Sequence, residues 1–169
     1  MSLIKSLEKR KREKFMRVFN DIRKNLKRIY SNLSGGGYVD LILENPGDPT
    51  SSGIIMIAAP PGKKRTRIEA LSGGERSLVA LSFIFAIQEI QPSPFYVLDE
   101  ADMFLDAINA ENVGRMLRER SRNSQFIVIS LRRPVLKYAD VIIGITQPKK
   151  RGVSEILTFP GVQDAPRAQ

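Results

Sequence analysis

The 169-residue sequence contains no cysteine, no histidine and no tryptophan. Without cysteine the chain can form neither a disulfide framework nor a thiolate metal site. Without histidine it lacks the commonest general base and metal ligand, so a catalytic proton acceptor must be a carboxylate, a lysine or a tyrosine. No apolar stretch approaches the roughly 20 residues that span a bilayer, and the N-terminus lacks the apolar segment of a signal peptide. We therefore expect a soluble, cytoplasmic protein with no membrane partner.

Acidic residues are scarce at the start of the chain. Residues 1–30 hold eleven Lys or Arg against three Asp or Glu, a net charge of +8, whereas the remainder contributes only +1 to the total of +9. Two interpretations of this basic segment stay open. It contacts the phosphates of double-stranded DNA, in which case binding is strongly salt-dependent, or it is the solvated flank of a coiled coil.

Glycine and proline are absent from residues 3–30, which predicts one long helix. Apolar residues recur along its second half at spacings of four and three, as in a heptad seam; they are Phe15, Phe19, Ile22, Leu26 and Ile29. No other segment offers a helix of matching length. We therefore interpret residues 1–33 as a coiled-coil helix stub whose partner helix lies outside this chain. A helix docked on its own domain is the alternative.

After this helix, predicted strands alternate with predicted helices, which indicates an α/β fold with a layered sheet and flanking helices. The predicted strands cover residues 38–43, 53–59, 95–98, 125–131, 141–146 and 153–159, and the predicted helices cover 72–91, 107–121 and a short stretch after Pro134. We assign residues 34–160 to this domain and expect a disordered tail over 161–169.

The helix predicted over residues 72–91 opens with Ser72, Gly73, Gly74 and Glu75. A serine followed three residues later by a glutamate forms a capping box, which explains both of those residues. The glycines need another reason, because glycine inside a helix costs about 1 kcal/mol relative to alanine. Bare backbone at a helix N-terminus lets an anion such as phosphate approach the free N–H groups, and the helix dipole favours it there. The turn is therefore a candidate phosphate contact.

Four acidic residues follow the strand predicted at 95–98: Asp99, Glu100, Asp102 and Asp106. Adjacent residues on a strand point to opposite faces, so Asp99 and Glu100 can have separate roles. One carboxylate can bind Mg²⁺, and the other can orient or deprotonate a water. Capping of the following turn is the alternative. Four acids within eight residues, in a nearly neutral domain, predict a divalent-ion site.

Together these segments resemble a known family. "LSGGERSLVAL" is similar to the signature motif of ABC-type ATPases, "FYVLDE" resembles their Walker B strand, and "FLDA" looks like their D-loop. "PPGKK", together with the preceding helix, resembles the C-terminal head lobe of a structural-maintenance-of-chromosomes (SMC) protein, over about residues 36–159. The resemblance implies the C-terminal half of an ABC-type ATPase head, with ATP and Mg²⁺ as its nucleotide and metal.

The resemblance also implies roles for single residues. Asp99 would coordinate Mg²⁺, and Glu100 would polarise the hydrolytic water. Ser72 and Gly74 would contact the γ-phosphate of a nucleotide held by a second head, with Gly73 and Glu75 in the same binding turn. Asp106 would lie at the interface between the heads. The sequence departs from the pattern at Ser130, because the family's switch position often carries histidine. Serine can hydrogen-bond a phosphate or a water but cannot carry a proton charge.

A P-loop, Gly-x-x-x-x-Gly-Lys-Ser/Thr, is missing from the sequence. The segment Pro60–Lys64 comes nearest, but it has Ile57 where the first glycine belongs and no Ser or Thr after the lysine. We therefore expect the chain alone to be inactive, since a P-loop provides the cradle for the phosphates. The implied partners are an N-terminal SMC head lobe that carries the P-loop, a second head, a kleisin subunit and double-stranded DNA.

The implied location is the chromosome: the nucleoid in a prokaryote, the nucleus in a eukaryote. The sequence leaves three other interpretations open. A related head of the double-strand-break repair type has the same design. An ABC transporter subunit fits less well, because a charged heptad helix stands where its P-loop would lie. A non-enzymatic, DNA-binding coiled-coil module would need the Ser72–Glu75 turn only as a helix cap.

Overall fold

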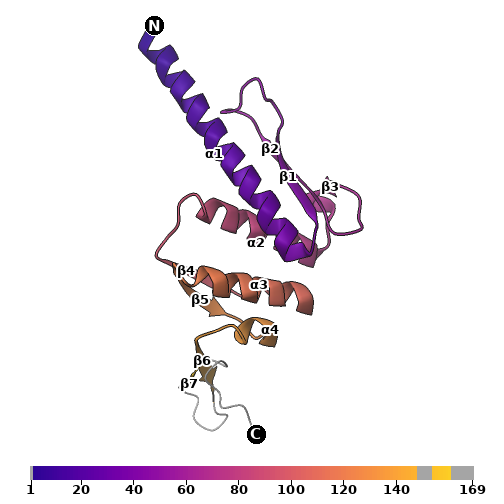
Figure 1. Ribbon diagram of the computed structural model, residues 1–169, viewed down its shortest axis with the longest axis vertical. Coiled ribbons are helices and arrows are strands. Elements are labelled where there is room, and N and C mark those ends of the chain that lie inside the picture. Colours follow the sequence, from indigo (N-terminus) through magenta and orange to yellow (C-terminus); the bar gives the residue numbers. More distant parts are fainter. Residues whose placement is uncertain (1, 148–153, 161–169) are drawn as a thin grey trace.

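The computed structural model describes residues 2–147 and 154–160. One long helix projects from a body built of short strands and helices (Figure 1). The helices are α1 (Ser2–Ser34), the 3₁₀ helix η1 (Ile68–Ala70), α2 (Gly73–Gln88), α3 (Ala107–Arg120) and α4 (Arg133–Leu136). The strands are β1 (Tyr38–Leu43), β2 (Ile54–Ala59), β3 (Thr66–Arg67), β4 (Phe95–Asp99), β5 (Gln125–Ile129), β6 (Val141–Thr146) and β7 (Glu155–Pro160).

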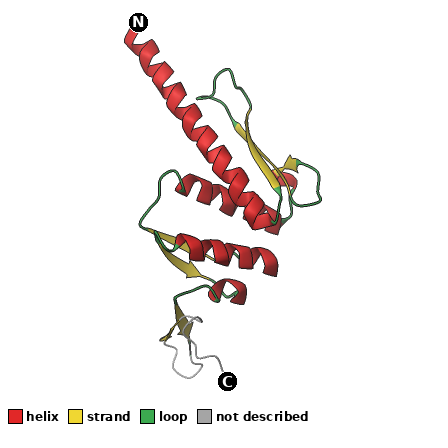
Figure 2. Ribbon diagram, viewed as in Figure 1, coloured by secondary structure: helices red, strands yellow, loops and turns green. Residues whose placement is uncertain are grey.

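The strands form three small sheets rather than the single layered sheet expected. In the described part of the chain, β1, β2 and β3 form an antiparallel sheet, β4 pairs in parallel with β5, and β6 pairs antiparallel with β7. Helices and strands are thus mixed, as predicted (Figure 2). The sequence pattern missed β3 and η1, which lie in a segment predicted to be a loop. Two residues are too few for a detectable alternation of apolar and polar side chains.

Helix α1 has two different halves. The side chains of Leu26, Ile29 and Tyr30 are buried in the core, where the second half of α1 packs on α2, β1 and α3. In the first half, Leu3 and Leu7 are exposed, and the helix extends beyond the body. The docking alternative is therefore correct for the second half. The coiled-coil interpretation remains a prediction for the projecting first half.

A cluster of charges fixes α1 to β1. The carboxylate of Asp40, on β1, is almost fully buried and accepts hydrogen bonds from Arg23 and from the Tyr38 hydroxyl, the latter at 2.9 Å. The ammonium of Lys27 lies 2.9 Å from the same carboxylate. Burial raises the pKa of Asp40, but hydrogen bonds from Arg23, Lys27 and Tyr38 lower it more, so its pKa lies well below the usual range. The angle at which α1 leaves the body is thus set by ion pairs as well as by apolar packing.

The pair β4–β5 is covered on one face only. On the inner face, Phe126 stacks on Tyr96 with ring centroids 5.0 Å apart and contacts Phe85 of α2 at 6.4 Å. The opposite face, which we call the open face, consists of side chains that alternate with these along both strands; its apolar members are Phe95, Val97, Ile127 and Ile129. Val97 is 56% exposed and Ile127 is 47% exposed. Apolar residues on both faces are typical of parallel strands that are buried on both sides.

Candidate functional site

The turn before α2 forms the predicted capping box. Ser72 is the N-cap in an extended conformation, and both its backbone N–H and its hydroxyl donate to Glu75 Oε2, at 3.0 and 2.8 Å. The hydrogen bond from Lys63 and those from Ser72 lower the pKa of Glu75 against a smaller opposing effect of burial. Glu75 is therefore held as a carboxylate, and it organises the first turn of α2.

The two glycines of this turn have different surroundings. A Cβ on Gly74 would lie 2.4 Å from the backbone oxygen of Phe104, so the absence of a side chain lets the segment after β4 pack against α2. A Cβ on Gly73 would meet nothing within 4 Å in this chain. The glycine at position 74 is thus explained by packing within its own chain, which the sequence alone did not show. Gly73 has no such explanation, and its backbone is open for a group from outside the chain to approach.

The strand β4 ends on Asp99, and Glu100 follows it outside the strand. Asp99 shares the open face with Phe95 and Val97, whereas Glu100 has a φ of +48°. The expected strand alternation therefore does not extend to Glu100. Among the described residues, Glu100 is the only non-glycine residue with a positive φ. Such conformations are uncommon outside glycine and cluster at functional sites, where the surrounding structure maintains them.

The other two acids after β4 are engaged within the chain. Asp102 is buried and accepts a hydrogen bond of 2.6 Å from the hydroxyl of Ser130, and Ser130 Oγ in turn accepts one of 3.0 Å from the backbone of Arg132. Asp106 is the N-cap of α3, and its two carboxylate oxygens accept from the backbone and the side chain of Asn109, at 2.7 and 2.8 Å. Both acids therefore organise local structure here.

The four acids do not form one metal site. Within residues 2–147 and 154–160, no group of three or more Asp and Glu side chains could hold a metal ion. Asp102 and Asp106 instead bind Ser130 and Asn109, so the divalent-ion site stays a prediction that rests on Asp99. The exposed carboxylate of Asp99 still fits Mg²⁺, which is commonly held by one or two carboxylates while substrate phosphates and waters complete its ligands.

Sequence reasoning missed Lys63. Its ammonium lies 2.8 Å from Glu75 Oε1, on the side of the carboxylate away from Ser72. The sequence does contain a signal, since Pro-Pro-Gly favours a tight turn that presents the next residue. The motif comparison treats the same segment only as an incomplete P-loop.

Comparison with known proteins identifies the family. Residues 5–154 match the family model described as the RecF/RecN/SMC N terminal domain. The chain belongs to this family. Its SMC members include curated relatives named chromosome partition protein Smc: the relative from Aquifex aeolicus is 49% identical over 91% of this chain, and the one from Pyrococcus furiosus is 47% identical over 94%. The chain spans 13% of the length of each of these two SMC proteins.

Solved SMC head structures share the fold. A chain from a study of ATP-driven dimerisation and DNA-stimulated activation of SMC ATPases is 46% identical, with a TM-score of 0.80, and the match covers 87% of this chain and 88% of that one. The Pyrococcus furiosus Smc head with an extended coiled coil, bound to the C-terminal domain of ScpA, is also 46% identical, with a TM-score of 0.88 over 94% of this chain and 39% of that one. The mixed α/β fold is therefore that of SMC heads.

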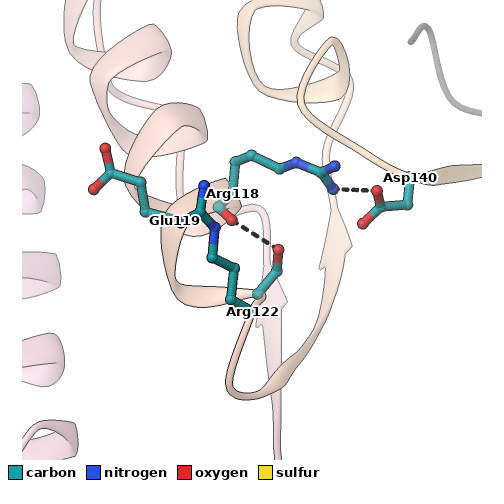
Figure 3. A pocket seen from close by; sticks show the side chains of 5 residues that line it. Arg118, Glu119, Arg122 and Asp140 are labelled. Carbon is teal, nitrogen blue, oxygen red and sulfur yellow. Dashed lines mark hydrogen bonds and ion pairs between the residues drawn. The ribbon is translucent and has the colours of Figure 1, made fainter.

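The hollows on the surface of this SMC chain lie elsewhere. One, of about 310 Å³, is lined by Arg118, Glu119, Ser121, Arg122 and Asp140, and the ion pair between Arg118 and Asp140 crosses it (Figure 3). None of the predicted site residues lines it, so it is not the candidate site. In the described ranges, no helix has the length and apolar character required to cross a membrane.

Proposed function

We propose that this chain is the C-terminal lobe of an SMC ATPase head, and that it hydrolyses ATP only together with an N-terminal lobe that carries a P-loop. The matched family model takes its name from an N-terminal domain, so the assignment to a lobe rests on this chain's own residues. The sequence contains the turn at residues 72–75 and the Asp99–Glu100 pair but no P-loop. ATP hydrolysis therefore requires a second polypeptide segment.

Strand β4 is the observation that carries the proposal. Its end supplies Asp99 and Glu100, and its open face is apolar and exposed. Exposed apolar faces of this kind mark interaction sites. A P-loop lobe that covers the open face would bring its bound nucleotide to the same edge. There Asp99 would hold Mg²⁺, and Glu100 would orient the attacking water. The metal, when bound, neutralises charge on the phosphates.

The turn at residues 72–75 serves the nucleotide of a second head. The open backbone of Gly73 and the dipole of α2 favour a terminal phosphate there. Because the phosphate is present in ATP and absent after hydrolysis and release, it supplies the differential affinity that shifts heads between joined and separate states. Asp106 would lie at the interface between heads, and Ser130 would contact phosphate or water after exchanging its bond to Asp102.

Mixing experiments test this proposal. We expect ATP turnover when the chain is combined with the P-loop lobe, and none from the chain alone. Glu100→Gln should abolish turnover while ATP-bound dimers persist, and Ser72→Arg should prevent ATP-dependent association of heads. Turnover at the wild-type rate by Glu100→Gln would refute the role of Glu100. Head association that is unaffected by Ser72→Arg would refute capture of the phosphate by this turn.

The further partners are a kleisin subunit and double-stranded DNA, at the chromosome. Solved Smc heads are bound to ScpA domains. Here Ile156 and Leu157 are exposed on β7, which pairs only with β6 in the described part. This edge suits a kleisin better than the heptad stripe of α1, whose second half is buried. For DNA, the basic residues of the projecting half of α1 are exposed. DNA binding that is flat between low and moderate salt would refute that role.

The relatives named chromosome partition proteins favour chromosome organisation and DNA entrapment over the break-repair alternative. A non-enzymatic module remains the contrasting case. It predicts the same coiled-coil helix but no ATP turnover with any P-loop lobe.

A further inference from the structure

The loop between β2 and β3 places a lysine against the turn that begins α2. The backbone N–H of Lys63 donates to the carbonyl of Pro60 at 3.0 Å, and Gly62 has a φ of +76°. A proline at the second position and a glycine with positive φ at the third define a type II turn. Strands β2 and β3 pair on either side of it, at Ile57 with Arg67. The lysine is thus presented by a closed hairpin.

The contacts of Lys63 link the hairpin to the start of α2. Glu75 binds Lys63 through Oε1, at 2.8 Å, and Ser72 through Oε2, so both of its oxygens are occupied. The ion pair is partly exposed, since the side chain of Lys63 is 63% exposed and that of Glu75 is 22% exposed. An exposed ion pair contributes little to the free energy of unfolding, typically below about 1 kcal/mol. Stability alone is therefore a weak reason for the pair.

A carboxylate at this position opposes the proposed role of the turn. The N–H groups and the helix dipole attract a phosphate, but the negative charge of Glu75 on the same turn repels it. The Ser72 hydroxyl currently donates to Glu75, so it must rotate to donate to a phosphate. Glu75 then keeps the Ser72 backbone N–H and the Lys63 ammonium as partners. The lysine can both cancel the charge and hold the carboxylate in place.

We propose that Lys63 is a positioning residue of the phosphate-capturing turn, which neutralises Glu75 and holds the capping box in shape while a neighbouring head's triphosphate approaches. This inference rests on the proposed function. It adds a residue from the β2–β3 hairpin to the site. Lys63 acts through Glu75 and makes no bond to the reacting phosphate.

The test uses the complete head, this chain paired with the P-loop lobe, and titrates ATP in assays of head association and turnover. Lys63→Met should raise the ATP concentration for half-maximal association about tenfold, as expected for one uncompensated charge near the phosphate. The rate at saturating ATP should stay within about twofold, because Lys63 does not touch the reacting atoms. Lys63→Arg should retain most of the wild-type affinity, and the defect of Lys63→Met should shrink at high salt.

Two further variants separate charge compensation from a merely structural role. Glu75→Gln in the Lys63→Met background should restore most of the affinity, because a neutral amide needs no cation and still accepts from Ser72. Lys64→Met is the matched control: it lies next to Lys63, is exposed, and forms no ion pair in the described part of the chain, so it should behave as wild type.

The outcomes distinguish this inference from the proposed function. Suppose that wild-type heads hydrolyse ATP and that Lys63→Met leaves the ATP concentration for half-maximal association unchanged. The inference is then wrong while the proposed function stands. The inference is also wrong if Lys63→Met lowers the melting temperature, Glu75→Gln fails to restore it, and Lys64→Met weakens ATP-dependent head association equally. If wild-type heads neither associate nor turn over with ATP, both proposals fail.

Discussion

Two apolar regions of this molecule, the buried core and the open face of β4 and β5, are built from similar residues but have opposite surroundings. Leu26, Val39 and Phe85, from α1, β1 and α2, are each 0% exposed, whereas Val97 and Ile127 on the open face are about half exposed. Aliphatic residues in strands contribute to both. The difference shows that the described residues complete one core and leave the open face of β4 and β5 exposed. We expect the proposed P-loop lobe to cover this open face.

The largest expected effect is a core truncation on the closed side, by which we mean the core where α1 packs on α2, β1 and α3. Phe85→Ala should lower the free energy of unfolding by about 3–5 kcal/mol, because it removes a buried ring and leaves a cavity. Ile127→Ala on the open face should cost the isolated chain no more than about 0.5 kcal/mol, as for surface substitutions. Urea unfolding of both variants measures the contrast.

The difference in cost between Phe85→Ala and Ile127→Ala should become smaller in the assembled head. Once the P-loop lobe covers the open face, Ile127→Ala should weaken association of the two lobes, which a binding titration would detect. An equal cost of the two substitutions in the isolated chain would mean that the chain itself buries the open face. The buried core and the open face would then not differ in how the chain covers them.

The next effect concerns the charges that join α1 to β1. Asp40→Asn should cost about 2 kcal/mol at neutral pH, since it removes one partner of a nearly buried ion pair whose cations, Arg23 and Lys27, remain partly exposed. The pKa of Asp40 is depressed in the folded chain, so its contribution is full above the unfolded pKa of about 4 and is lost as pH falls further.

Unfolding measured from pH 7 downward checks that the stability contributed by Asp40 is lost in acid. The stability gap between wild type and Asp40→Asn should be constant at and above pH 6 and should close progressively below about pH 4. A gap that widens with acid would show that Asp40 is protonated in the folded chain. The closed side would then depend on packing alone.

The closed side could be predicted from sequence better than the open face. The heptad spacing along α1 and the apolar run of α2 identify buried positions, because local periodicity reports which face is covered. The capping box of Ser72 and Glu75 and the strand that ends at Asp99 were predictable for the same local reason. Periodicity does not say which molecule covers a face. The apolar runs "FYVL" and "QFIVISL" are typical of buried strands, although one face of β4 and β5 is exposed here.

What the sequence could not show are contacts between distant segments. Lys63 reaches Glu75, Ser130 binds the buried Asp102, and Arg23 binds Asp40. Each pair is fixed by how loops fold back, and charge patterns alone do not specify such partners. The positive φ of Glu100 is also a tertiary feature, because its backbone N–H is held by Ile129 O of β5 at 2.9 Å.

Substitutions of two neighbouring glycines, Gly73 and Gly74, should have smaller effects on stability. Gly74→Ala should destabilise the chain by about 1–2 kcal/mol, since its Cβ would press on the carbonyl of Phe104. Gly73→Ala should leave stability unchanged or slightly raised, because alanine favours a helix and its Cβ meets nothing here. Gly73→Ala should nevertheless weaken ATP-dependent head association. Thermal melts and association assays together check this, and normal association of Gly73→Ala heads would remove the case for phosphate approach at that residue.

The smallest effect is expected where α1 projects from the body. Leu7 is 56% exposed on the same helix on which Leu26 is fully buried, so Leu7→Ala should change the free energy of unfolding of this chain by less than about 0.5 kcal/mol. Leu26→Ala, the matched control, should cost about 2–5 kcal/mol. If a partner helix completes a coiled coil along the first half of α1, its addition should make Leu7→Ala destabilising, since the side chain then enters a heptad interface. No change on adding that helix would refute the coiled-coil interpretation and would leave the first half of α1 as a solvated basic arm.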